Sequence, residues 1–428
     1  MLADLINEVG VRVRQHELSR RTVLKAGAVA GFTGMTVVNV PVPAQALTMG
    51  PGPESVLEWI DQPDPIPFPV SDNVTTPATW EELEDWHTPN NQFFTVKHYN
   101  LPALTAETFA LTVDGMVDHS LSFSLADLMN LPRREVDFTL ECSGNHGPPF
   151  FVSGIGNALW AGASLAGVLR RAAPKHDGVE VVFWGADEGP VTIRDDSGIT
   201  SGGVTGVTEP DSGGGLDLSI TEQFARSMSL ADAMHPQNLL CYEMNGSPLP
   251  PLHGYPLRLI APGWYGVANV KWLSRIELRD GRYAGRFMAR DYVTIREGAV
   301  AGKTVWTFTT VGHVRIKSAP ARVVRRGAQH TVQGAAWGGE IDRVDVQIGD
   351  GPWQRARIRR MRTQGDRDFS WSFWTFDWGE PPAGTYSIRS RAVGDHGALQ
   401  PAPEDPYLAS RRTYWENNGQ VTRSVQIV

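Results

Sequence analysis

Residues 138–147 read Phe-Thr-Leu-Glu-Cys-Ser-Gly-Asn-His-Gly, and their cysteine, Cys142, is one of only two in a chain of 428 residues. The apolar residues from Val136 to Leu140 have the pattern of a strand, and the glycine and asparagine that follow indicate a loop. A thiolate on a loop at a strand end can reach a metal ion, and sulfur suits soft, redox-active metals. Free cysteine is also among the most often buried residue types, so a structural cysteine is the alternative. The segment by itself leaves both interpretations open.

The N-terminus has the order of an export signal. Residues 19–25 read Ser-Arg-Arg-Thr-Val-Leu-Lys, an apolar stretch runs from Ala26 to Val40, and residues 44–46 read Ala-Gln-Ala. An arginine pair, an apolar run and a small-x-small cleavage site predict a twin-arginine signal peptide over residues 1–46. The apolar part is too short for a membrane span, and a short buried helix is the alternative. We therefore expect a periplasmic protein, exported in folded form and often with its cofactor already inserted.

Composition indicates a globular protein. Hydrophobic residues make up 41% of the chain, charged residues 20%, and the formal net charge is -8. No basic block or later membrane-length apolar stretch is present, so we expect no nucleic acid partner and no membrane span. About 380 residues remain after the leader, enough for two or more domains. The two cysteines form no disulfide framework and the Cys-x-x-Cys-His pattern of attached haem is absent, so an electron acceptor must be another molecule.

The chain is predicted to be α+β. Residues 47–92 read as an extended segment with a short helix near Thr79 to Trp86. Residues 93–302 are predicted to contain both short strands and short helices. The predicted strands are Phe109 to Val113, Val136 to Leu140, Val179 to Trp184 and Pro256 to Ile260. The predicted helices are Ser124 to Asn130, Ser164 to Ala172 and Ile220 to Met228, and Asp195 to Asp217 is expected to be a glycine-rich surface loop.

Residues 303–428 have a different character. Short alternating runs separated by turn signals predict an immunoglobulin-like β-sandwich. Its predicted strands are Val311 to Ile316, Gln329 to Ala336, Ile341 to Ile348, Arg355 to Arg360, Ser370 to Phe376 and Gly384 to Ala392. Trp371, Trp374 and Trp378 are expected to pack in the core or an interface, since alternate residues of a strand face one side.

Three further motifs follow the cysteine loop in order. Residues 242–250 read Tyr-Glu-Met-Asn-Gly-Ser-Pro-Leu-Pro, residues 253–258 read His-Gly-Tyr-Pro-Leu-Arg, and residues 270–273 read Val-Lys-Trp-Leu. Together with Cys142-Ser143-Gly144-Asn145 they resemble the sulfite oxidase family of molybdopterin oxidoreductases, and its exported bacterial sulfite or sulfane dehydrogenases in particular. The resemblance covers about residues 90 to 428. It implies one molybdenum–molybdopterin cofactor per chain, with Cys142 as the protein's metal ligand, and a molybdopterin domain followed by the β-sandwich, which often forms a homodimer interface.

The resemblance also implies roles for individual residues. Arg258, Lys271 and His253 are clustered cationic donors, and the arginine fork suits the phosphate of molybdopterin. Each could instead be an ordinary strand charge or loop histidine; likewise Asp187 could be a turn residue, Trp160 a core residue, and Tyr292 a half-buried tyrosine. The implied pterin contacts are Phe94, His98, Asp187, His253, Arg258, Asn269, Val270 and Lys271, and the implied active-site residues are Tyr292, Trp160 and His146.

The sequence departs from the family where sulfite would bind. Animal and plant members hold this dianion with arginines. Here Val96 stands at one expected arginine, and His146-Gly147 stands where a pair is expected. Arg423 is a candidate survivor, and His146 could add charge when protonated. The sequence therefore predicts weak sulfite binding.

Three functions remain open. The first is an exported molybdenum oxidoreductase that oxidises sulfite or a protein-bound sulfane and passes electrons to a separate cytochrome c. The second is a periplasmic reductase of oxidised methionine, although such enzymes generally lack the terminal β-sandwich. The third is a secreted binding protein that contains no molybdenum.

Overall fold

The structure, a computed structural model, describes residues 54–61, 73–75, 78–147, 152–195, 216–360 and 369–428. The chain divides after Ala44, and every described residue belongs to the part Gln45–Val428. The predicted signal peptide lies outside the described residues, as does most of the predicted glycine-rich loop. None of the helices in these ranges has the length and apolarity that a bilayer crossing requires.

The described chain is mostly β, with short helices, which corrects the balance of the predicted α+β class. The helices are α2 (Leu125–Met129), α3 (Leu165–Ala172), α4 (Leu230–Ala233), α5 (Arg286–Ala289) and α6 (Pro406–Ala409). The helices predicted at α2 and α3 are confirmed, and each begins at a serine that caps it. Ser124 Oγ accepts from the Asp127 N–H at 3.1 Å, and Ser164 Oγ accepts from the Gly167 N–H at 3.2 Å. These bonds satisfy N–H groups that a helix start leaves unpaired.

Two five-stranded sheets build the part of the chain around Cys142. One has the order β5-β4-β13-β8-β9, and β13 runs parallel to β4 while the other neighbours are antiparallel. The other has the order β11-β10-β7-β6, with β12 also paired to β10. Their bounds are β4 Ala110–Gly115, β5 Leu121–Ser124, β6 Arg133–Glu141, β7 Ile155–Ser164, β8 Glu180–Asp195, β9 Leu216–Ser229, β10 Leu239–Met244, β11 Ser247–Pro248, β12 Arg258–Ile260 and β13 Leu273–Arg279. The four strands predicted for this region all fall within or overlap these elements.

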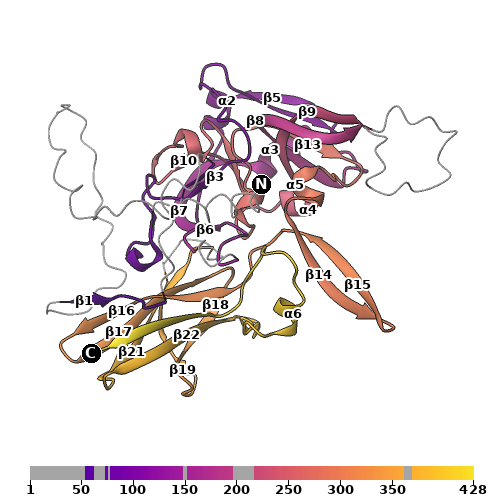
Figure 1. The fold of residues 1–428 in the computed structure, drawn as a ribbon. Helices are drawn as coiled ribbons and strands as arrows, with labels where there is room; N and C mark the ends of the chain where they lie inside the picture. Colours follow the sequence, from indigo (N-terminus) through magenta and orange to yellow (C-terminus); the bar gives the residue numbers. More distant parts are fainter. Residues whose placement is uncertain (1–53, 62–72, 76–77, 148–151, 196–215, 361–368) are drawn as a thin grey trace, which may run out of the picture. The chain divides into compact units, whose positions relative to one another are not determined.

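The predicted helix Ile220 to Met228 is wrong, because these residues belong to β9. Strand β9 pairs with β8 along a long antiparallel hairpin, visible in Figure 1. Ile220, Phe224 and Met228 are spaced four apart, and that spacing puts residues on one face of a helix and also on one face of a strand. Pairing with β8 decides between the two, as tertiary context commonly overrides local preference.

Two further sheets form a β-sandwich, and all of their strands except β1 come from the C-terminal part of the chain. Their orders are β1-β16-β17-β21-β20 and β19-β18-β22-β23. Val323 and Val332 of the first sheet share one buried cluster with Val344, Ile388 and Val425 of the second. The bounds are β1 Ser55–Leu57, β16 Lys317–Arg326, β17 Gln329–Trp337, β18 Ile341–Ile348, β19 Gln354–Arg355, β20 Arg357–Arg360, β21 Ser372–Gly379, β22 Gly384–Gly394 and β23 Val421–Ile427. The N-terminal segment thus supplies β1, and its predicted helix is the short 3-10 turn Trp80–Glu82.

The entry into the sandwich differs from the prediction. Residues 311–316 are not a strand, and β16 begins only at Lys317. Its charged residues and Pro320 hide the strand pattern, and Pro320 is tolerated because the register with β17 shifts there. Between Tyr292 and residue 311 lies an unpredicted hairpin, β14 (Val293–Val300) and β15 (Lys303–Thr310). Trp371 and Trp374 are buried, as predicted, and Trp378 packs at the edge of the sandwich core.

Gly162 provides a test of the sheet that carries the cysteine loop. It lies in β7, between β6 and β10, and a Cβ there would lie 2.1 Å from the carbonyl oxygen of Leu240. We expect Gly162→Ala to lower the free energy of unfolding by about 1–3 kcal/mol, because the backbones must move apart. Gly281→Ala is the matched control, since a Cβ there meets nothing within 4 Å. Equal stability of the two variants in chemical denaturation would contradict this packing.

Candidate functional site

A pocket with about 670 Å³ of empty space opens beside Cys142. Its walls combine aromatic residues, cations and one carboxylate, drawn from segments far apart in the sequence. The lining residues are Phe93, Phe94, Thr95, Val96, Lys97, His98, Leu140, Cys142, Asp187, Phe224, Leu252, His253, Arg258, Gly266, Val267, Asn269, Lys271, Trp272 and Tyr292. The structure therefore gathers nine of the twelve site residues predicted from the sequence.

Cys142 lies directly after β6, where the strand ends. Its N–H donates to the Gly154 carbonyl at 2.8 Å, and its own carbonyl accepts from the Asn145 N–H at 2.9 Å. The side chain is half-buried, whereas Cys241 is fully buried in the neighbouring core. Burial raises the pKa of the Cys142 thiol to about 11. The thiol is therefore neutral near pH 7, and a metal ion bound to it would stabilise the thiolate form.

Arg258 and Lys271 are basic residues of the pocket lining, and burial lowers the pKa of Lys271 to about 7. Arg258 is buried, and its two terminal nitrogens donate to the carbonyls of His253 and Asn269 at 3.0 and 3.1 Å. Its Nε is buried with no hydrogen-bond partner among the described residues. Lys271 Nζ donates to the Leu252 carbonyl at 3.0 Å. Burial lowers the pKa of Arg258 to about 10, so it stays charged at neutral pH.

Asp187 lines the same pocket as these basic residues. It lies where the register between β8 and β9 shifts, between Trp184 and Glu188. Its side chain is 3% exposed, and Oδ1 has no hydrogen-bond partner among the described residues. Burial raises the pKa of this carboxyl to about 7, and Lys271 partly opposes the rise. A buried acceptor left unpaired is costly, so it marks a place where a ligand with N–H groups would be stabilised.

His98 and Tyr292 form a hydrogen-bonded pair in the pocket lining. His98 Nε2 lies 2.7 Å from the Tyr292 hydroxyl, and the imidazole packs against Phe224 and Phe287. Burial, aided by Lys271, lowers the pKa of His98 to about 3, so the ring is neutral. Burial also raises the pKa of Tyr292 well above its usual range. The pair therefore presents a neutral phenol held in place by a neutral imidazole.

His253 needs a correction, because it is not a cationic donor. Its side chain is 5% exposed, and Nε2 lies 3.2 Å from the Asn90 carbonyl. Burial, with Arg258 and Lys271 nearby, lowers the pKa of His253 to about 3. It lines the pocket as a neutral group, so Arg258 is the neighbouring side chain that stays positively charged at neutral pH.

Three predicted site residues lie outside the pocket lining. Trp160 is fully buried beneath it, with the Arg258 guanidinium 4.9 Å from its ring. Val270 is buried in the core, and its carbonyl accepts from the Leu259 N–H. His146 packs against Trp80 and Trp337, and burial lowers its pKa well below the usual value. The expected compensating charge at His146 is therefore wrong, since the ring is neutral and lies away from the pocket.

Arg423 also does not replace a substrate arginine. Its guanidinium lies 3.3 Å from Asp61 and 3.2 Å from Glu81, and it packs over Trp59 in the sandwich. Val96 does line the pocket, as the sequence comparison with the family requires. Among the pocket residues the cationic side chains are Lys97, Arg258 and Lys271.

Sequence reasoning missed several contributors. Lys97 lies between two residues that were considered, and its Nζ donates to Asn73 at 2.8 Å. Trp415 stacks on Tyr292, with ring centroids 4.4 Å apart. No local motif surrounds Trp415, so only the tertiary structure reveals this contact. Asn269 was predicted, but its side chain is occupied by backbone groups of Ala261, Trp264 and Tyr265.

Comparison with known proteins identifies similar molybdopterin oxidoreductases. Residues 98–202 and 204–287 match the family described as oxidoreductase molybdopterin binding domain. The chain is 32% identical to sulfite oxidase of Gallus gallus over 317 residues, which is 68% of this chain and 63% of that protein. It is 32% identical to mitochondrial sulfite oxidase of Homo sapiens over 347 residues, or 74% of this chain and 58% of that protein. The chain thus spans about three fifths of the length of these relatives.

The fold is also similar to a solved structure, the sulfane dehydrogenase SoxCD from Paracoccus pantotrophus. The TM-score is 0.65 at 22% identity, and the match covers 96% of this chain and 100% of the other. The residues present fit molybdopterin. The unpaired Oδ1 of Asp187 and Nε of Arg258 offer an acceptor and a donor to a cofactor that is rich in hydrogen-bonding edges.

The carboxyl of Asp187 gives a pH test of this fit. Because its pKa in the folded chain is about 7 instead of 3.8, the folded chain keeps a proton that the unfolded chain releases. The free energy of unfolding of the cofactor-free chain therefore falls as pH rises from the unfolded pKa of 3.8 to the folded pKa of about 7. We expect Asp187→Asn to gain stability relative to the unsubstituted chain between about pH 4 and about pH 8, by on the order of 1–4 kcal/mol. Thermal unfolding of protein made in a host without molybdopterin measures this, and a difference independent of pH would contradict it.

Proposed function

This chain belongs to the sulfite oxidase family of molybdopterin oxidoreductases, and we propose that it is a molybdenum enzyme that oxidises a sulfur compound. The observation that carries the proposal is the pocket itself. It places one thiol, Cys142, beside an unpaired carboxylate, a buried guanidinium and a tyrosine hydroxyl. Such a set can hold a metal and a polar organic cofactor together while leaving a phenol for the substrate.

Each wall of the pocket has a proposed task. The Cys142 thiolate would ligate the metal, and Asp187, Arg258 and Lys271 would bind the pterin and its phosphate. His98, Phe94, His253 and Asn269 would shape the rest of the cofactor site. Molybdenum on molybdopterin supplies two-electron redox chemistry when bound.

Tyr292 is proposed to contact the substrate. Its hydroxyl stays protonated at neutral pH and is fixed by His98 at 2.7 Å. A phenol held in this way can donate a hydrogen bond to an oxygen of a sulfur compound. Trp415 stacks on the Tyr292 ring, so the ring is held by this contact as well as by the His98 hydrogen bond.

Oxidation is favoured over reduction of oxidised methionine. The family of reductases considered above generally lacks a terminal β-sandwich, and this chain has two packed sheets there. The binding-protein alternative is disfavoured, because the chain carries the molybdopterin-binding domain. Sulfite and a protein-bound sulfane are the proposed substrates, in line with what the relatives' names say of those proteins.

Export and partners are part of the proposal. The twin-arginine pattern at residues 19–25 supports a periplasmic location, and a separate cytochrome c is the proposed acceptor. We also propose immunoglobulin-like connectivity for the sandwich and a homodimer formed through it, since symmetric dimers are the commonest soluble oligomers.

Metal analysis tests the proposed function. We expect about one molybdenum per chain, and Cys142→Ser should remove or disable it because oxygen replaces the soft ligand. Cys241→Ala is the matched control, since Cys241 is buried in the same sheet and lies outside the pocket. Full turnover of Cys142→Ser with thiosulfate, sulfite or a sulfane-carrying protein would refute the proposal.

The charge of the pocket predicts weak sulfite oxidation. Each charge-assisted hydrogen bond to an anion contributes roughly 1.5–3 kcal/mol, and two substrate arginines of the family are replaced here. Sulfite affinity should therefore be lower than in a typical sulfite oxidase by roughly two to four orders of magnitude. Since His146 is neutral and outside the pocket, it should restore nothing at low pH.

Val96→Arg should recover part of this affinity, because Val96 lines the pocket. We expect the KM for sulfite to fall by roughly tenfold or more, measured with cytochrome c or ferricyanide as acceptor. Val96→Met adds bulk without charge and should not lower it. A low micromolar KM in the unsubstituted enzyme would show that the pocket is cationic by another route.

A further inference from the structure

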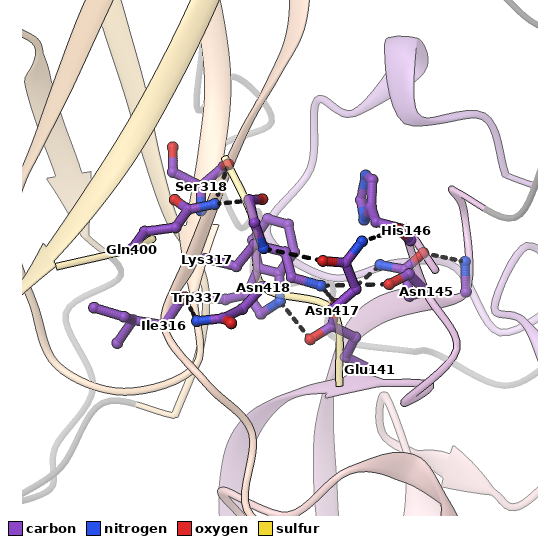
Figure 2. Close-up of polar contacts among 12 residues, drawn as sticks. Glu141, Asn145, His146, Ile316, Lys317, Ser318, Trp337, Gln400, Asn417 and Asn418 are labelled. Carbon is purple, nitrogen blue, oxygen red and sulfur yellow. Dashed lines mark hydrogen bonds and ion pairs between the residues drawn. The ribbon is translucent and has the colours of Figure 1, made fainter. Parts of the chain in front are cut away.

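The strand that ends at Cys142 is held by the β-sandwich through a buried carboxylate. Glu141, the residue before Cys142, is fully buried. Lys317, the first residue of β16, lies with its Nζ 2.6 Å from Glu141 Oε1. Trp337, the last residue of β17, donates its indole N–H to Glu141 Oε2 at 2.8 Å. Figure 2 shows both side chains reaching Glu141 from the sandwich.

The backbone that follows Cys142 is held from the same direction. We call residues 142–147 the cysteine loop. Lys317 Nζ also donates to the Asn145 carbonyl at 3.4 Å. The Glu416 N–H donates to the Ser143 carbonyl at 2.8 Å, and the Asn417 side chain donates to the His146 carbonyl. His146 has a positive φ of 59°, a conformation that non-glycine residues adopt rarely and that neighbouring contacts must sustain.

The supporting residues are themselves joined to each other. Gln400 Oε1 accepts from the Ser318 N–H at 2.8 Å, and Gln400 Nε2 donates to the Gly419 carbonyl at 3.0 Å. Asn418 Nδ2 donates to the Ile316 carbonyl at 3.4 Å (Figure 2). The start of β16 and residues 416–419 therefore form one cross-linked support behind the cysteine loop.

Stability alone is a weak reason for this ion pair. Removing two charges from water costs several kcal/mol per ion, and well-packed apolar residues often serve as well in a core. Glu141 is instead matched to its donors: besides Lys317 and Trp337, Asn145 Nδ2 donates to Oε1 at 3.0 Å. Groups that orient a metal ligand from behind typically change metal affinity or activity by 10–100-fold when removed. A satisfied carboxylate that adjoins the metal-binding thiol is in the position for that task.

We propose that Lys317 is a positioning residue for Cys142: through Glu141 it fixes the cysteine loop in the conformation that presents the thiolate to molybdenum. The β-sandwich is then a working part of the metal site as well as a domain beside it. This inference rests on the proposed function, since it requires the metal at Cys142.

The first experiment compares two buried cations of the same strand. Lys317→Met removes the charge that reaches Glu141. Arg322→Met is the matched control, because Arg322 is also buried in β16 but binds Glu84 and Gln333, away from the cysteine loop. Holoenzyme is assayed for molybdenum content, for the rate of molybdenum release and for the electron paramagnetic resonance spectrum of the Mo(V) state. We expect Lys317→Met to release molybdenum 10- to 100-fold faster and to shift the spectrum, with neither change in Arg322→Met.

A second pair of variants guards against a loss of folding. Trp337→Phe keeps an aromatic ring and removes only the N–H that reaches Glu141. Trp374→Phe is its control, since Trp374 is buried in the same sheet and its indole N–H has no partner among the described residues. We expect Trp337→Phe to release molybdenum about tenfold faster, which is the lower end of the range given above. Trp374→Phe should leave the release rate unchanged.

The outcomes separate this inference from the proposed function. If release rates and spectra follow thermal stability alike in all four variants, Lys317 is only structural and the inference is overturned. If the unsubstituted chain binds no molybdenum when the cofactor is supplied, the proposed function itself fails. A changed spectrum in Lys317→Met and Trp337→Phe, at unchanged molybdenum content in both controls, supports the inference.

Discussion

The buried contact between Lys317 and Glu141 joins the sandwich to the strand that ends at Cys142. At 2.6 Å, with both side chains almost without exposure, the pair leaves little freedom in how β16 meets the end of β6. Breaking a buried pair on one side leaves an uncompensated charge, which is costly in a low-dielectric interior. The ion pair therefore fixes the position of the end of β6 relative to the sandwich. Cys142 is the next residue, so the position of its thiol depends on how the sandwich packs.

The pocket contains one arginine that stays charged and two histidines that are neutral. Arg258 remains a cation despite burial, while His98 and His253 are neutral because burial lowers the pKa of both rings. Asp187 is the acceptor left without a hydrogen-bond partner at Oδ1 among the described residues. Unpaired buried groups are tolerated mainly where a ligand completes them. The site is thus prepared for a large polar molecule with both donors and acceptors, and it is poorly prepared to hold a free dianion beside Val96.

Much of this site could be predicted from sequence because its residues lie in compact motifs. Cys142, His253, Arg258 and Lys271 each belong to a short run with recognisable turn chemistry, and the structure brings all four to one pocket. His146 does not line the pocket, because its side chain packs against Trp80 and Trp337, and nothing local in the sequence encodes that direction. The prediction of a helix for part of β9 is wrong, because residues four apart lie on one face of an α-helix and also on one face of a β-strand. Long-range partners, such as those of Glu141, have no sequence signature at all.

The last residues before β23 show how the sandwich also reaches the substrate side. Trp415 stacks on Tyr292 at 4.4 Å, while the Glu416 backbone binds the cysteine loop and its carboxylate accepts from Thr294. Residues 415–417 therefore contact both the proposed substrate donor and the loop of the proposed metal ligand. A shift of this segment would disturb both contacts, because consecutive residues of the same segment make them. These contacts connect the C-terminal segment to the pocket, although no sandwich residue lines the pocket among the described residues.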